Sequence, residues 1–299
     1  GTMVEERKVP ADVTYGLSDA DQHYYEAHDA VTRHLPREHR HAIHWIEVDG
    51  RKTLLVNNKL LTLIPNPTYD PVGQPGSLEM YFRAENHQGL EMRDIIKMGP
   101  IPPAARDRAE RVRKLDEQHV DLAWVLPSLG LGLEEMMRDN PDMLYAAFHS
   151  YNEWLDEDWG FAYQDMIYAA PYITLADPQW AVDEAEWAIS RGVKVVVMRT
   201  SPAIDPFGGT RSPGDAVYDP FWARLAEANV AVAFHSGDAG YGKYIDDWEP
   251  FGEFEAFKSS PMRVMTTPRV SPNWSWLPSA IAISRMTTRV RFRGLTSTR

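Results

Sequence analysis

Residues 192–199 read G-V-K-V-V-V-M-R, and residues 230–238 read V-A-V-A-F-H-S-G-D. Each is a short apolar run, rich in valine, that ends abruptly in polar residues. Runs with no polar alternation are typical of parallel strands covered on both faces. The intervening Tyr218–Asn229 segment has the apolar spacing of an amphipathic helix. Strand, helix and strand in this order predict a parallel α/β fold.

The same alternation extends toward the N-terminus. Asp177 and Pro178 predict the cap and first position of a helix that stops at Gly192. A further helix is expected over Pro103–Gln118. Five strands are expected in all, at Leu17–His23, Val120–Leu126, Ile167–Leu175, Val193–Met198 and Val230–His235.

One region, about residues 44–86, breaks this rhythm. Trp45–Val48 and Thr53–Val56 flank an Asp49-Gly50 pair, a combination that predicts a β-hairpin. A proline-rich loop follows. We interpret this region as an insertion between the first strand and the first helix of the alternation.

Composition and charge limit the classes of partner and metal ligand to be expected. The 299 residues carry 43 acidic and 31 basic side chains, a formal charge of −12, which disfavours nucleic acid as the main partner. The sequence has no run of about 18 apolar residues, so it predicts no membrane span. There is no cysteine, so a metal must be held by His, Asp or Glu. The N-terminus has no apolar leader, and we expect a cytoplasmic protein. The expected partners are a small-molecule substrate and, optionally, a second copy in a homodimer.

Two strand ends carry candidate site residues. His235 closes the last strand, where barrel enzymes place functional side chains. Asp21 and His23 close the first strand at spacing i, i+2, so both project to one face. Together they have the chemistry to chelate a divalent ion. The alternatives are a hydrogen-bonded core histidine at 235 and a polar loop with a capping aspartate at 21.

Other candidates have simpler interpretations. His39, His41 and His44 lie in a basic segment and are expected on a solvated face. His149 and Asn152 lie in an aromatic helix and are expected to pack. Arg199 ends the fourth strand, where it either binds a substrate carboxylate or pairs with a nearby aspartate.

Taken in order, five segments resemble the amidohydrolase superfamily. More narrowly they resemble the group typified by aminocarboxymuconate-semialdehyde decarboxylase and the resorcylate-type decarboxylases. The segments are D-A-D-Q-H-Y-Y-E at 19–26, H-V-D-L-A-W-V-L-P-S at 119–128, Y-I-T-L-A-D-P at 172–178, G-V-K-V-V-V-M-R at 192–199 and V-A-F-H-S-G-D at 232–238. The resemblance covers about residues 15–269.

The resemblance implies a (β/α)₈ barrel of the TIM type, here incomplete with about five recognisable strands. It implies one divalent metal ion, usually zinc, held by Asp21, His23 and His235. Arg199 stands where relatives with two metals have a carbamylated lysine, which favours a single ion. The implied reaction is hydrolysis of a small carboxylated or cyclic substrate through a metal-bound water. Decarboxylation is the alternative, favoured by the carboxylate-x-His motif.

The family's sixth-strand histidine, an acid/base, and eighth-strand aspartate have no counterpart, so the catalytic acid/base stays unassigned. Residues 270–299 contain no Asp, Glu or Lys but five Arg. We therefore expect residues 1–269 to form the barrel-like domain. The tail is expected to be a truncated or frame-shifted end, and an inactive fragment is the third functional alternative.

Overall fold

The computed structural model describes residues 15–85, 87–205, 207–238 and 240. The Arg-rich segment at 270–299, and the expectation of a truncated or frame-shifted end after Arg269, lie outside the described residues.

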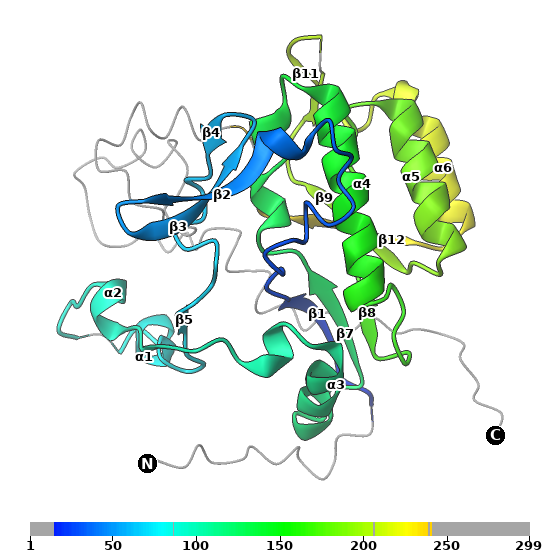
Figure 1. The fold of residues 1–299 in the computed structure, drawn as a ribbon. Coiled ribbons are helices and arrows are strands. Elements are labelled where there is room, and N and C mark those ends of the chain that lie inside the picture. The colour runs from blue at the N-terminus through cyan, green and yellow to red at the C-terminus, as the bar shows by residue number, and fades with distance from the viewer. Residues whose placement is uncertain (1–14, 86, 206, 239, 241–299) are drawn as a thin grey trace, which may run out of the picture. The chain divides into compact units, whose positions relative to one another are not determined.

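Five parallel strands follow one another in chain order (Figure 1). They are β1 (Ser18–His23), β7 (Leu122–Leu126), β8 (Ile167–Ala169), β9 (Val195–Arg199) and β12 (Ala231–His235). β7 pairs with β1 and β8, and β9 pairs with β12. A parallel bridge between Tyr172 and Val197 joins the segment after β8 to β9. The row therefore runs β1, β7, β8, β9, β12.

The third strand differs from its expected range of Ile167–Leu175. β8 ends at Ala169 because Pro171, which has no backbone N–H, interrupts the ladder. Beyond it, the N–H of Ile173 donates to the carbonyl of Val197 at 3.0 Å, so the chain still runs beside β9.

Four helices alternate with the strands: α3 (Arg108–Glu117), α4 (Pro141–Asp158), α5 (Pro178–Ser190) and α6 (Asp219–Glu227). Asp177 caps α5 as expected, accepting a hydrogen bond from the N–H of Trp180, and Gly192 follows the helix with a φ of +82°. The helix expected over Pro103–Gln118 is instead a short 3₁₀ turn followed by α3. The break falls at Asp107, whose side chain caps the new helix.

The core lies between the strands and these helices. All five residues of β9 are buried, and Ala181, Ala185 and Ala188 of α5 are fully buried in the same hydrophobic core. β12 is more open, and Phe234 is 51% exposed. Within residues 15–240 as described, the strands form a row of five and no closed ring. No helix in the described part of the chain has the length and apolar character needed to cross a bilayer.

The excursion between β1 and α3 contains the expected hairpin. β2 (Ile43–Val48) pairs with β3 (Arg51–Val56), and the turn residues Asp49 and Gly50 have φ of 51° and 73°. Both values suit a type I′ turn. The other elements here are β4 (Lys59–Leu60), β5 (Val72–Gly73), α1 (Glu79–Phe82), α2 (Met92–Ile95) and β6 (Met98–Gly99). Because β5 pairs with β6, the excursion continues to Gly99.

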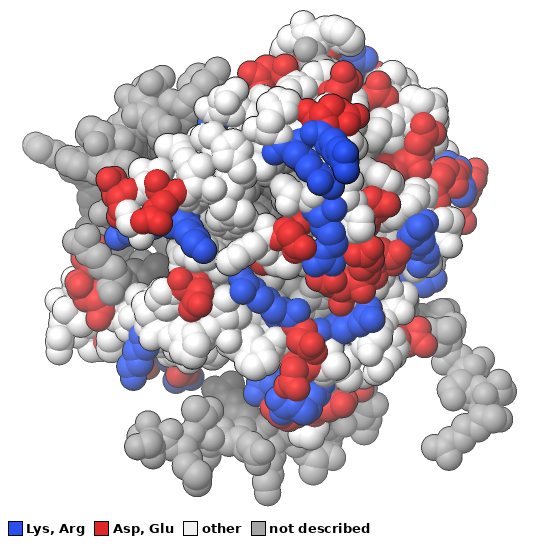
Figure 2. All heavy atoms as spheres, viewed as in Figure 1, with Lys and Arg blue, Asp and Glu red and all other residues white. Residues whose placement is uncertain are grey.

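Charged side chains pair extensively. On the face drawn in Figure 2, basic side chains lie among acidic ones. Arg33, for example, contacts Asp29, Glu157 and Asp158 at 2.8–3.2 Å. Exposed pairs of this kind each contribute at most about 1 kcal/mol.

A buried polar network joins α4 to α5. The Asn152 side chain bonds to both the N–H and the carbonyl of Tyr172, each at 2.9 Å, and donates to Glu184 at 2.8 Å. Glu184 is 4% exposed and also contacts Nδ1 of His149 at 2.7 Å. His149 and Asn152 therefore hold two helices together, as a packing interpretation requires.

This network makes part of the stability dependent on pH. The hydrogen bond to Glu184 raises the pKa of His149 against the opposing effect of burial. The protonated form is therefore favoured in the folded state. Its stabilisation is complete below the ordinary histidine pKa of about 6.5 and disappears as the pH rises through the raised value. Because the side chain is 40% exposed, we expect less than about 1 kcal/mol.

The measurement is the difference in unfolding free energy between wild type and His149→Gln, by urea denaturation. We expect a larger difference at pH 5.5 than at pH 9. His44→Gln, at an exposed position, is the control. A difference that grows with pH would contradict the assignment.

Candidate metal centre

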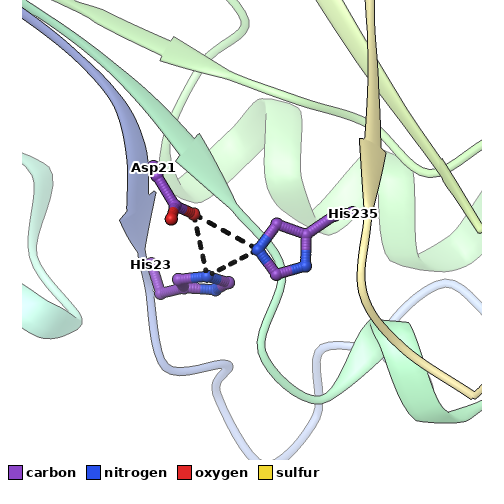
Figure 3. Close-up of side chains that lie close together, drawn as sticks. All are labelled: Asp21, His23 and His235. Carbon is purple, nitrogen blue, oxygen red and sulfur yellow. Dashed lines mark hydrogen bonds and ion pairs between the residues drawn. The ribbon is translucent and has the colours of Figure 1, made fainter. Parts of the chain in front are cut away.

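The three residues expected as ligands meet at one point (Figure 3). Nε2 of His23 lies 3.1 Å from Nε2 of His235. Oδ1 of Asp21 lies 3.2 Å from Nε2 of His235 and 3.6 Å from Nε2 of His23. Asp21 and His23 come from β1 and His235 from the end of β12, so the site joins the two ends of the strand row.

The curvature of the row makes this meeting possible. Five strands about 4.8 Å apart would place β1 and β12 about 19 Å apart in a flat sheet. Two imidazoles do not span that distance. The strands must therefore curve so that the two edges face each other, as in a barrel wall.

The pairing of β1 with β7 shifts register next to Asp21. Asp19 pairs with Ala123 and Gln22 with Val125, so β1 advances three residues while β7 advances two. The extra residue lies between Asp19 and Gln22, where Ala20 and Asp21 together face one residue of β7. Bulges re-aim side chains in this way and occur often next to active sites.

Backbone carbonyls assign the tautomers of both histidines. Nδ1 of His23 lies 2.7 Å from the carbonyl of Pro127, and Nδ1 of His235 lies 2.8 Å from the carbonyl of Ser236. A carbonyl only accepts, so each Nδ1 carries a proton. In the neutral rings, both Nε2 lone pairs then face each other and the carboxylate of Asp21. Three electron donors around one point call for a cation.

The ionisation of the cluster agrees with this. When the imidazoles are protonated, Nε2 of each ring can donate to Asp21, and this interaction with His23 and then with His235 holds the pKa of Asp21 well below its usual range, outweighing burial. For His235, burial alone would lower the pKa, but the hydrogen bonds to Asp21 and to the Ser236 carbonyl together raise it. The site therefore keeps a negative carboxylate and attracts positive charge.

These ligands fit zinc. Zinc bonds of about 2.0–2.2 Å in a tetrahedron place the ligand atoms about 3.3–3.6 Å apart. The three separations here are 3.1, 3.2 and 3.6 Å. Two imidazoles and one carboxylate suit zinc better than calcium or magnesium, which prefer oxygen ligands. Three protein ligands leave one tetrahedral position for water or substrate, which is the arrangement of catalytic sites.

A buried arginine steadies the end of β1. Arg111 is 8% exposed and donates to the carbonyl of His23 and to Oε1 of Gln22, both at 2.7 Å. It also donates to the carbonyl of Ala104 at 2.6 Å. No residue pattern predicts this role, because the partners of Arg111 are mostly backbone atoms.

Arg199 lies in register with His235 on the neighbouring strand. It is 6% exposed, with Nη1 3.0 Å from Oε2 of Glu135 and Nε bonded to the hydroxyl of Ser201. Its ionic partners are thus glutamates, not the aspartate that we considered. An open cavity of about 530 Å³ adjoins Arg199, with Arg211 and Phe234 in its lining. None of the three metal-site residues lines it, and substrate binding by Arg199 stays a prediction.

The remaining histidines of the sequence analysis do not join this cluster. His41 and His44 are exposed and His39 is half-buried, around the start of the β2 hairpin. His149 belongs to the network between α4 and α5.

Of the three comparisons with known proteins, the one with solved structures gives matches. No protein-family model and no curated protein matches the chain. Among solved structures, it is similar to an amidohydrolase from Mycobacterium avium subsp. paratuberculosis K-10, with 38% sequence identity and a TM-score of 0.74. The alignment covers 79% of this chain and 62% of that one. The likeness supports an assignment to the amidohydrolase superfamily and implies a TIM-barrel-type α/β fold. This chain spans 62% of the relative's length.

Proposed function

We propose that this chain is a metal-dependent enzyme of the amidohydrolase superfamily that hydrolyses a small carboxylated or cyclic substrate. One observation carries the proposal. Asp21, His23 and His235 direct three electron-donor atoms at one point, and both histidines are held in the tautomer that leaves Nε2 free.

In this proposal the three residues hold one divalent ion. We propose zinc because two imidazoles and one carboxylate suit that ion. Such an ion, when bound, supplies a Lewis acid that activates water or polarises a substrate oxygen. The residues of the chain do the rest. Asp21 would offset one of the two positive charges of the ion, and the Pro127 and Ser236 carbonyls fix the orientation of the two imidazoles.

Arg199 is the proposed ligand of a substrate carboxylate. Its described hydrogen bonds use Nε and Nη1. Nη2 is therefore the nitrogen proposed to reach the substrate, because a guanidinium carries donors on all three nitrogens.

No acid/base group is assigned, since His235 is the last histidine of the sequence. A general acid/base contributes about 10²–10⁴-fold in rate, so for the 299 residues by themselves we propose weak turnover. Bound zinc without turnover on any substrate would favour the inactive alternative.

A decarboxylase is the second candidate. The observation that favours it is the first-strand pair itself, in which a carboxylate, Asp21, stands two residues before His23. A product analysis separates the two reactions. Hydrolysis of an ester, lactone or amide releases an acid, whereas decarboxylation of a carboxylated ring releases carbon dioxide.

The test of the proposal is zinc binding by chelator-treated protein, measured by calorimetry and metal analysis. We expect about one ion per chain, and about 2.7 kcal/mol of added stability at a free zinc concentration 100 times Kd. Protons compete with zinc for His235, whose pKa is raised. Affinity should therefore fall as the pH falls, by about tenfold per unit below that raised pKa. Wild-type protein that binds no zinc at millimolar concentration would refute the proposal.

A further inference from the structure

A buried acid lies three residues beyond His23. Glu26 is 2% exposed, yet one of its oxygens, Oε1, accepts four hydrogen bonds. Three come from the successive N–H groups of Ser128, Leu129 and Gly130, at 2.9, 2.7 and 3.0 Å. The fourth comes from the hydroxyl of Tyr151 at 2.8 Å.

The bonding of Glu26 is one-sided. Oε2 is buried and has no hydrogen-bond partner among the residues that the structure describes. A buried polar atom without a partner is destabilising, because it has lost its hydrogen bonds to water. All the described hydrogen bonds of the side chain are instead made by Oε1, and three of the four come from one loop. The role of Glu26 is therefore to hold that loop.

The loop that Glu26 holds is the one that orients His23. Residues 128–130 directly follow Pro127, whose carbonyl accepts the Nδ1 proton of His23 at 2.7 Å. Ser128 adds a second connection, since its hydroxyl donates to the carbonyl of Tyr24 at 2.7 Å. Glu26 thus connects the end of β1 to the loop after β7 at the place where the tautomer of His23 is set.

We infer that Glu26 is a positioning residue for the proposed metal centre. It holds the Pro127 carbonyl against Nδ1 of His23, and so keeps Nε2 unprotonated and directed at the ion. This inference rests on the proposed function for its consequence, zinc affinity. Its direct content, the tautomer of His23, can be measured without metal. Partners of metal-ligating histidines generally change metal affinity 10–100-fold when removed.

The variants differ in how well they reproduce Oε1. Glu26→Gln keeps an acceptor at the same reach, Glu26→Asp withdraws it by one methylene, and Glu26→Ala removes it. We expect zinc affinity to fall less than 3-fold in E26Q, about 10-fold in E26D and up to about 100-fold in E26A. If E26A does not fold, the contrast between E26D and E26Q decides. Tyr151→Phe is the matched control: it removes the one donor outside the loop and should change affinity less than 3-fold.

The second readout is the ¹⁵N chemical shifts of the His23 imidazole in zinc-free protein at pH 8.5. We expect protonated Nδ1 and bare Nε2 in wild type and E26Q, and a tautomer mixture in E26D. A purely structural Glu26 would leave these shifts unchanged. Folded E26D with wild-type zinc affinity and an unchanged His23 tautomer overturns the inference. If wild type binds no zinc, the proposed function fails, and the tautomer shifts still decide the role of Glu26.

Discussion

Replacing His235 by alanine should lower zinc affinity at least about 100-fold. Its Nε2 lies 3.1 Å from Nε2 of His23 and 3.2 Å from Oδ1 of Asp21, so its loss leaves a two-ligand site. Removal of a partner that only orients a ligand costs 10–100-fold, and removal of the ligand itself should cost more. Any hydrolytic turnover that depends on the ion should fall with it. The measurement is competitive zinc titration against a chelating dye.

Asp21→Asn tests the charge separately from the shape. The amide keeps the size of the carboxylate but offers zinc a neutral oxygen, and we expect a smaller loss than in H235A. His44→Ala is the control, since this histidine is exposed on β2, outside the cluster. Zinc affinity within threefold of wild type in both H235A and Asp21→Asn would show that the ion binds elsewhere.

The grouping of the three candidate residues could be predicted from the sequence because strand ends are visible in it. A valine-rich run that stops at a histidine places His235 at a strand terminus, and the i, i+2 spacing places Asp21 and His23 on one face. The bulge in β1 left no such mark, because Ala20 and Asp21 fit an ordinary strand equally well. The carbonyls that fix the histidines were invisible for a more general reason, since every residue has one.

Other features depended on contacts between distant segments. Arg199 was expected beside an aspartate or a substrate, and its observed partner Glu135 comes from the loop after β7, 64 residues earlier. Glu26 could have been noticed as an acid directly after two tyrosines, but its partners at 128–130 are backbone groups. Pro171 indicates in the sequence that this strand ends early, but the expected range of Ile167–Leu175 extends past it.

Replacing Asn152 by alanine should cost about 3–5 kcal/mol of unfolding free energy, the largest stability effect that we expect. The side chain is fully buried and makes three hydrogen bonds, two of them to the backbone of Tyr172. The substitution leaves the Tyr172 N–H and carbonyl without this partner and removes one donor from the buried Glu184. Each buried group left unpaired costs about 1–3 kcal/mol, and more when it is charged.

The measurement is urea denaturation of zinc-free protein, with Gln179→Ala as the matched control on α5. The Gln179 side chain bonds only to Asp183 among the described residues and is exposed to solvent, so its loss should change stability by less than about 0.5 kcal/mol. A loss below about 1 kcal/mol in Asn152→Ala would mean that water reaches the Tyr172 backbone, and that the contact between α4 and α5 is open enough to hydrate it. A loss in the expected range, with zinc affinity retained, would separate the stability of the helix layer from the chemistry at the strand ends.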